Sequence, residues 1–213
     1  MLRTSASVSV LLVVAAALAA AGCGASAPPV VVTPMTPESE ASFENGADFI
    51  ADPSLLEGSW LDTWESDIEH RVTLADAIAV VRITTVRHDT DLQHHDTYHL
   101  VATVDNVRYG TLDSEVSLSV HEGTGGFGTI AGNDDRLLSP PADHPDHFIL
   151  FVKWTRGEDG ALEARWHISP AGTAVVQRVN SLIELRRQDS EERRRIIVRT
   201  TTDDDDDDDA DDD

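Results

Sequence analysis

The sequence is poor in cysteine, in basic side chains and in lysine above all. Among its 213 residues Cys23 is the only cysteine, which excludes an intramolecular disulfide framework and a zinc site built on several cysteines. Sixteen basic residues, with Lys153 as the single lysine, stand against 39 acidic ones, and the formal net charge is −23. Because nucleic-acid binding needs a basic surface that displaces counterions, this charge argues against a nucleic-acid partner.

Local signatures of hydrolases are also missing. The patterns G-x-S-x-G, H-E-x-x-H and S-x-x-K do not occur in the chain. We therefore expect a protein that is not an enzyme. Scattered Asp, Glu and His residues can still meet in a fold and form an acid–base pair, so a hydrolase stays open as an alternative.

The N-terminus has the features of an export signal. Arg3 supplies the one positive charge before an uncharged, strongly apolar segment, residues 6–21, and small residues follow. A short basic start, an apolar run and small residues before a break are typical of a secretory signal peptide. The run is also shorter than the roughly 20 residues that a membrane-spanning helix needs.

The end of this segment, Ala20-Ala21-Gly22-Cys23, resembles the lipobox of bacterial lipoproteins. In that family a diacylglyceryl group is attached to the cysteine sulfur and a peptidase cuts just before the cysteine. The resemblance implies cleavage between Gly22 and Cys23, removal of residues 1–22 and membrane attachment through the lipid. Ala20 departs from the leucine that the family prefers there. A plain cleaved signal or an uncleaved anchor is the alternative interpretation.

The residue after the cysteine bears on localisation. It is Gly24, not the Asp that retains enteric lipoproteins in the inner membrane. The resemblance therefore implies the outer membrane in a host that has one, and otherwise the outer face of the cell membrane. The acidic body predicts that the membrane is contacted through the lipid on Cys23 and not through the folded domain.

Composition divides the rest of the chain into three segments. Residues 23–51 are rich in proline and predict a flexible tether in extended conformation behind the lipidated cysteine. Residues 52–187 predict a β-rich globular domain with an N-terminal helix. Residues 188–213 are highly charged and end in ten aspartates, which offer nothing apolar to bury and predict a disordered tail.

Within the globular segment the hydrophobic pattern favours strands. Asp52-Pro53 is a helix start signal, and a four-residue stripe follows it, made of Leu56, Trp60, Trp64 and Ile68. Alternating or continuous apolar runs predict strands at 78–86, 98–104, 116–120, 148–154 and 162–168, a sixth at 173–179, and a helix from Ser181. Successive strands joined by turns predict a mainly β fold, either a small antiparallel, OB-like barrel or a sandwich, with one or two flanking helices.

The order of these features over residues 73–180 is similar to the OB-like barrels of the netrin and tissue-inhibitor-of-metalloproteinase type. The similarity rests on the lead-in Leu74-Ala75-Asp76-Ala77, the step Tyr109-Gly110, the strand at 148–152 and the closing turn Ser169-Pro170-Ala171-Gly172. Animal members carry disulfides and an N-terminal cysteine that engages a protease zinc. This chain has neither in its folded segment, so the resemblance implies the fold and not the inhibitory activity.

Histidines are concentrated in the middle of the chain and form the candidate metal site. The six candidate ligands are His88, His94, His95, His99, His144 and His147. Neutral imidazoles with neighbouring carboxylates are good ligands for Zn²⁺, Cu²⁺ or Ni²⁺. We expect the segment 88–99 to be a loop that runs into the second strand, so a metal site requires this loop to fold back. A solvated polar hairpin loop is the alternative.

The segment Gly123–Gly128 contains the letters G-x-G-x-x-G. A nucleotide-binding fingerprint requires a strand before it and a helix directly after it. The residues that follow, 129–135, predict a loop, and we therefore interpret the glycines as a flexible loop.

Together these features predict an exported, lipid-anchored envelope lipoprotein. Its β-domain has a non-catalytic binding or scaffolding role towards an envelope protein or a small ligand, and no cofactor is expected. A metal-binding lipoprotein that uses the segment 88–99 and an envelope hydrolase are the two alternatives.

Overall fold

The computed structural model describes residues 32, 34–142, 144–157 and 160–202, with side chains up to Arg193 in the last of these ranges. The predicted signal peptide, Cys23 and the ten terminal aspartates lie outside the described residues. The described chain forms α1 (Pro37–Ser42), β1 (Gly46–Ala47), η1 (Pro53–Leu55), α2 (Ser59–Leu74), β2 (Ala77–Thr90), β3 (Asp96–Tyr109), β4 (Glu115–His121), α3 (Phe127–Ile130), α4 (Asp134–Leu138), β5 (Phe148–Arg156), β6 (Leu162–Pro170) and α5 (Thr173–Thr202).

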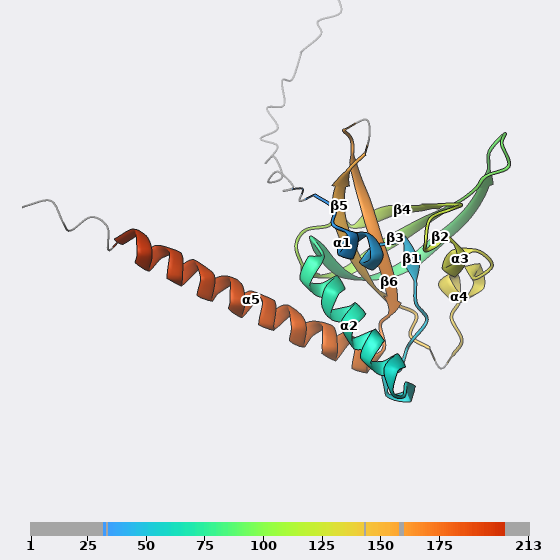
Figure 1. The fold of residues 1–213 in the computed structure, drawn as a ribbon. Coiled ribbons are helices and arrows are strands. Elements are labelled where there is room, and N and C mark those ends of the chain that lie inside the picture. Colours follow the sequence, from blue (N-terminus) through green and yellow to red (C-terminus); the bar gives the residue numbers. More distant parts are fainter. Residues whose placement is uncertain (1–31, 33, 143, 158–159, 203–213) are drawn as a thin grey trace, which may run out of the picture. The chain divides into compact units, whose positions relative to one another are not determined.

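The strands form one curled sheet in the order β1-β6-β5-β2-β3-β4 (Figure 1). All neighbours pair antiparallel except β1, which pairs parallel to β6. The predicted small, barrel-like antiparallel fold is therefore confirmed, and helices make up about as much of it as strands. The five predicted strands up to 162–168 correspond to β2 through β6.

The curl of the sheet brings its two ends together without closing a hydrogen-bonded barrel. Trp166 of β6 donates its indole Nε1–H to the carbonyl oxygen of Ser119 on β4, at 3.1 Å. Inside the curl lies an apolar core to which the central strand β5 contributes Phe148, Leu150 and Val152. The side chains in between, from Ile149 and Phe151, point to the other face. This alternation follows from the two-residue period of a strand and gives the sheet two cores.

Helix α2 and the first part of α5 pack together on the outer face of the sheet, and the rest of α5 extends away from it (Figure 1). The second core joins Trp64, Ile68 and Val72 of α2 to Val175 and Val179 of α5. The prediction of a sixth strand at 173–179 is therefore wrong. Valines four residues apart lie on one side of a helix, and burying that side against α2 outweighs their preference for strands.

The long helix α5 differs from the prediction at its other end as well. Its backbone continues to Thr202, through the first part of the segment 188–213 that composition predicts to be disordered. Arg186 fixes the helix on the body of the fold, because its guanidinium donates to the carbonyl oxygens of Val72 and Ala75 at 2.7 and 2.8 Å. It also stacks on the ring of Tyr109.

The predicted helix after Asp52 is divided into two elements. Asp52 caps the short helix η1, and α2 begins only after Gly58, whose φ of +56° interrupts the helical path. The predicted stripe is correct for Trp64 and Ile68, which are buried. Trp60, in the first turn of α2, is 76 % exposed.

The fold begins before the predicted domain boundary at residue 52. Helix α1 and strand β1 belong to it, and the Phe43 side chain between them is buried in the outer core. We call residues 37–48, which contain α1, β1 and Asp48, the strap. The tether predicted for residues 23–51 is therefore shorter than composition indicates, because a segment too short to show a hydrophobic period is held by long-range contacts.

Candidate functional site

The predicted histidine loop is a long two-stranded hairpin in which only residues 91–95 are loop. Strands β2 and β3 continue through the segment and pair up to Thr90 and Asp96. His88 therefore lies on a strand, where its Nε2 is 3.0 Å from Asp96 Oδ1 and its ring stacks on Tyr98. The β-branched residues of β2 extend the strand further than the polar composition of the segment suggests.

Three histidines of this hairpin, His88, His95 and His99, lie near three different carboxylates. His99 Nε2 lies 3.4 Å from Asp89 Oδ2, and His95 Nδ1 lies 3.4 Å from Asp91 Oδ2. The register places His88 opposite Tyr98, so His99, the next residue, points to the other face of the sheet. His88 and His99 therefore cannot bind the same ion.

The other two candidate ligands lie far from the tip of the hairpin. His147 Nε2 is 3.1 Å from Asp105 Oδ2 and precedes Phe148, which pairs with Val81 near the start of β2. Ten residues of strand separate that point from Asp91, or about 30 Å. His144 lies three residues before His147, in the segment that leads into β5. Among the residues that the structure describes, no group of three or more His, Cys, Asp or Glu side chains is arranged to hold a metal ion.

The glycine-rich segment is a seat for the strap. It is followed by α3 and α4 and not by the predicted loop, but α3 has only four residues. Gly126 N–H donates to the carbonyl oxygen of Glu44, and a Cβ on Gly126 would lie 2.4 Å from the carbonyl oxygen of Asn45. Gly46 faces Gly126 equally closely. The glycines therefore allow two backbones to touch, which a side chain on either would prevent.

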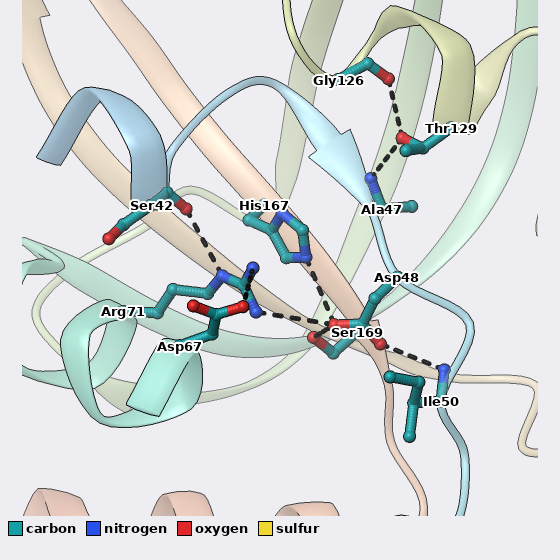
Figure 2. A network of polar contacts seen from close by, with 10 residues as sticks. All are labelled: Ser42, Ala47, Asp48, Ile50, Asp67, Arg71, Gly126, Thr129, His167 and Ser169. Carbon is teal, nitrogen blue, oxygen red and sulfur yellow. Dashed lines mark hydrogen bonds and ion pairs between the residues drawn. The ribbon is translucent and has the colours of Figure 1, made fainter. Parts of the chain in front are cut away.

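A buried polar cluster joins the strap to the sheet and to α2 (Figure 2). We call Asp48, Arg71, His167 and Ser169 the Asp48 cluster. Three donors converge on one carboxylate oxygen, Asp48 Oδ2: Ser169 Oγ at 2.6 Å, His167 Nε2 at 3.3 Å and Arg71 Nη1 at 3.6 Å. The other oxygen, Oδ1, accepts from the backbone N–H of Ile50.

Burial and charge set the protonation states in this cluster. Burial alone would raise the pKa of Asp48, but the hydrogen bonds from His167 and Ser169 and the charge of Arg71 outweigh it and hold the pKa below its ordinary value. Burial lowers the pKa of His167, and Arg71 acts in the same direction against the opposing effect of Asp48. The cluster therefore holds a carboxylate, a guanidinium and a neutral imidazole.

The geometry of the Asp48 cluster differs from that of a serine-hydrolase triad. In a serine hydrolase the imidazole lies between the serine and the carboxylate, and it takes the proton of the serine. Here His167 and Ser169 both donate to Asp48, and Ser169 is fully buried. Lys153, the only lysine, is likewise buried, and its Nζ lies 3.1 Å from Asp76 Oδ1 in an ion pair. Neither group is placed to attack a substrate.

A hollow of about 580 Å³ lies where α5 begins. Its lining includes Ala51, Asp52, His144, Gly172, Thr173 and Gln177. Gly172 allows the chain before α5 to approach Ala51, which follows the strap. A Cβ on Gly172 would lie 1.9 Å from the carbonyl oxygen of Ala51. A volume of this size is within the range of small-molecule sites.

Sequence reasoning found the histidines and missed the Asp48 cluster. Asp48 and His167 are 119 residues apart and stand in no spacing that indicates a shared site. No family model, no curated protein and no solved structure matches the chain. Of the helices in the described residues, none is long and apolar enough to cross a membrane.

Proposed function

We propose that this chain is an exported envelope lipoprotein, anchored by a diacylglyceryl group on Cys23, whose β-domain binds or scaffolds a partner. The observation that carries the proposal is the position of the only cysteine, at the end of the lipobox-like Ala20-Ala21-Gly22-Cys23 behind an apolar segment. Two or three acyl chains on one residue give firm membrane attachment, since each buried CH₂ contributes about 0.8 kcal/mol.

A binding or scaffolding role is supported by what the fold offers. The hollow beside Thr173 and Gln177 has the size for a small ligand, and the partner is such a ligand or an envelope protein. The buried Ser169 and Lys153 do not favour the hydrolase alternative. The curled sheet is compatible with the netrin-type resemblance, which stays a prediction.

Lipid attachment is tested in a bacterial host by metabolic labelling with a fatty-acid analogue and by intact mass. The wild type should be labelled, and its mature mass should correspond to a chain that begins at a diacylglyceryl Cys23. Cys23→Ser should be unlabelled and should keep residues 1–22. Ala20→Leu, which restores the preferred residue of the lipobox, is the matched control and should be labelled like the wild type. A labelled Cys23→Ser chain, or an unlabelled wild type, would contradict the proposal.

A further inference from the structure

The strap is held on the sheet by a short set of bonds around one buried histidine. Gly46 pairs with His167 and Ala47 with Ile168, the only two register positions of β1. Asn45 N–H donates to the Trp166 carbonyl oxygen at 2.9 Å, and Asp48 N–H donates to that of Ile168 at 3.0 Å. His167 therefore lies beside β1, near the C-terminal end of the strap.

The charged and titratable groups around His167 come from the strap and from α2. From the strap these are Asp48, which accepts from Nε2, and Glu44. From α2 it is Arg71, whose guanidinium is shared between Asp48 and Asp67. Figure 2 shows the imidazole between the strap and the guanidinium, with Ser169 beside it on β6. The carboxylate of Asp48 is thus already shared by three donors.

Protonation of His167 is incompatible with this closed arrangement. Because Nε2 already donates to a carboxylate, the neutral ring must carry its proton there, and Nδ1 is a buried acceptor with no hydrogen-bond partner. A second proton would turn Nδ1 into a buried donor without an acceptor. It would also place a second cation beside Arg71. Each of these changes is costly in a buried site.

Opening of the strap lowers both costs, although it also takes the carboxylate of Asp48 away from the ring. When residues 37–48 leave the sheet, water reaches the imidazole, accepts from the second N–H and screens the ring from Arg71. A proton therefore binds the open form much better than the closed form, and acid shifts the population towards the open form.

We propose that the strap is an acid-released latch, closed over neutral His167 and opened when His167 takes up a proton. Release uncovers the β6 edge at His167 and Ile168 and the Gly126 seat and withdraws Ala47 and Phe43 from the two cores, while the other residues of both cores stay packed. The direction of the pH effect follows from linkage. A histidine that is neutral in the closed form and has an ordinary pKa near 6.5 in the open form stabilises the closed form at neutral pH. That contribution is lost progressively as the pH falls below about 6.5. The proposal does not depend on the lipid anchor.

Backbone hydrogen exchange of the folded chain, expressed as protection factors between pH 7.5 and 5, tests the latch. This range stays above the ordinary pKa of an aspartate, and the pKa of Asp48 is held below that value, so Asp48 remains ionised. The amides of Asn45 and Asp48 should lose protection about tenfold per pH unit below 6.5. The amides of the central strands β2 and β5 should stay protected throughout. Strap amides as strongly protected as those of the centre at every pH, or a strap insensitive to pH, overturn the proposal.

A variant assigns the effect to His167. His167→Gln keeps an N–H donor that can reach Asp48 but cannot be protonated in this range, so its strap should stay protected at pH 5. His70→Gln, at an exposed position on α2, is the matched control and should behave like the wild type. If His167→Gln does not fold, the protection factors of the wild-type strap, compared with those of strands β2 and β5, still test the proposal. A His167→Gln strap that opens with acid as the wild type does would refute the role of His167.

Discussion

The Asp48 cluster and the histidine hairpin contain the same chemical pair in two different surroundings. In both, an imidazole nitrogen lies within about hydrogen-bond distance of an aspartate oxygen: 3.3 Å for His167 and Asp48, 3.0 Å for His88 and Asp96. The side chain of His167 is 3 % exposed and that of His88 is 42 % exposed. The shorter contact is therefore the one that water can replace.

This comparison teaches that burial and not distance decides what such a pair does. At the hairpin, water screens the charges and solvates either partner if the other is removed. In the Asp48 cluster the removal of one partner leaves buried groups with fewer contacts and little water to replace the missing one. Loss of the buried pair should therefore lower the stability of the fold, whereas water replaces the partner that an exposed pair loses.

The largest expected effect comes from breaking the buried pair. Asp48→Ala leaves the buried guanidinium of Arg71 without its nearest carboxylate and removes the acceptor of His167 and Ser169. We expect the free energy of unfolding to fall by about 3–5 kcal/mol, measured by chemical denaturation at pH 7. Asp96→Ala in the hairpin is the matched control and should leave the unfolding midpoint unchanged within error. Equal losses in the two variants would show that burial does not distinguish the pairs.

A smaller effect is expected when the strap is displaced without changing a charge. In Gly126→Ala the added Cβ would meet the carbonyl oxygen of Asn45 at 2.4 Å, so the strap must shift. We expect a loss of about 2 kcal/mol in the same denaturation experiment, together with faster hydrogen exchange in the strap. Gly128→Ala has open space for its Cβ and serves as the control. A Gly126→Ala protein as stable as Gly128→Ala would mean that the seat does not hold the strap.

The smallest effect is expected at the hairpin itself, in calorimetric titration with Zn²⁺, Cu²⁺ and Ni²⁺. Because His88 and His99 face opposite sides of the sheet and His147 is about 30 Å from the tip, the wild type should give no saturable heat. A variant with His94, His95 and His99 all changed to alanine should give the same trace. Saturable heat that disappears in this variant would restore the metal-binding alternative.

Sequence reasoning could find those parts of the fold that local pattern determines. The alternation of Val116, Leu118 and Val120 and the continuous apolar run from Phe148 place β4 and β5 correctly. It failed where a contact between residues far apart in sequence determines the local structure. Val175 and Val179 prefer strands locally, yet they pack on α2 as part of a helix.

The candidate site was less predictable than the fold for the same reason. Histidines near one another in sequence suggested a shared site, but the pleat of a strand separates His88 from His99. Asp48 and His167 lie far apart in sequence and meet only because two residues of β1 pair with β6. No local spacing could indicate that contact, because it depends on the curled sheet and on the glycine seat at Gly126.

The most direct test of the account is the charge and tautomer of the His167 ring at pH 7, read from its side-chain nitrogen chemical shifts by NMR. The account predicts a neutral imidazole with its proton on Nε2, because Nε2 donates to Asp48 and Nδ1 has no partner. An imidazolium at pH 7, or a neutral ring with its proton on Nδ1, would contradict the latch and the structural role assigned to the Asp48 cluster.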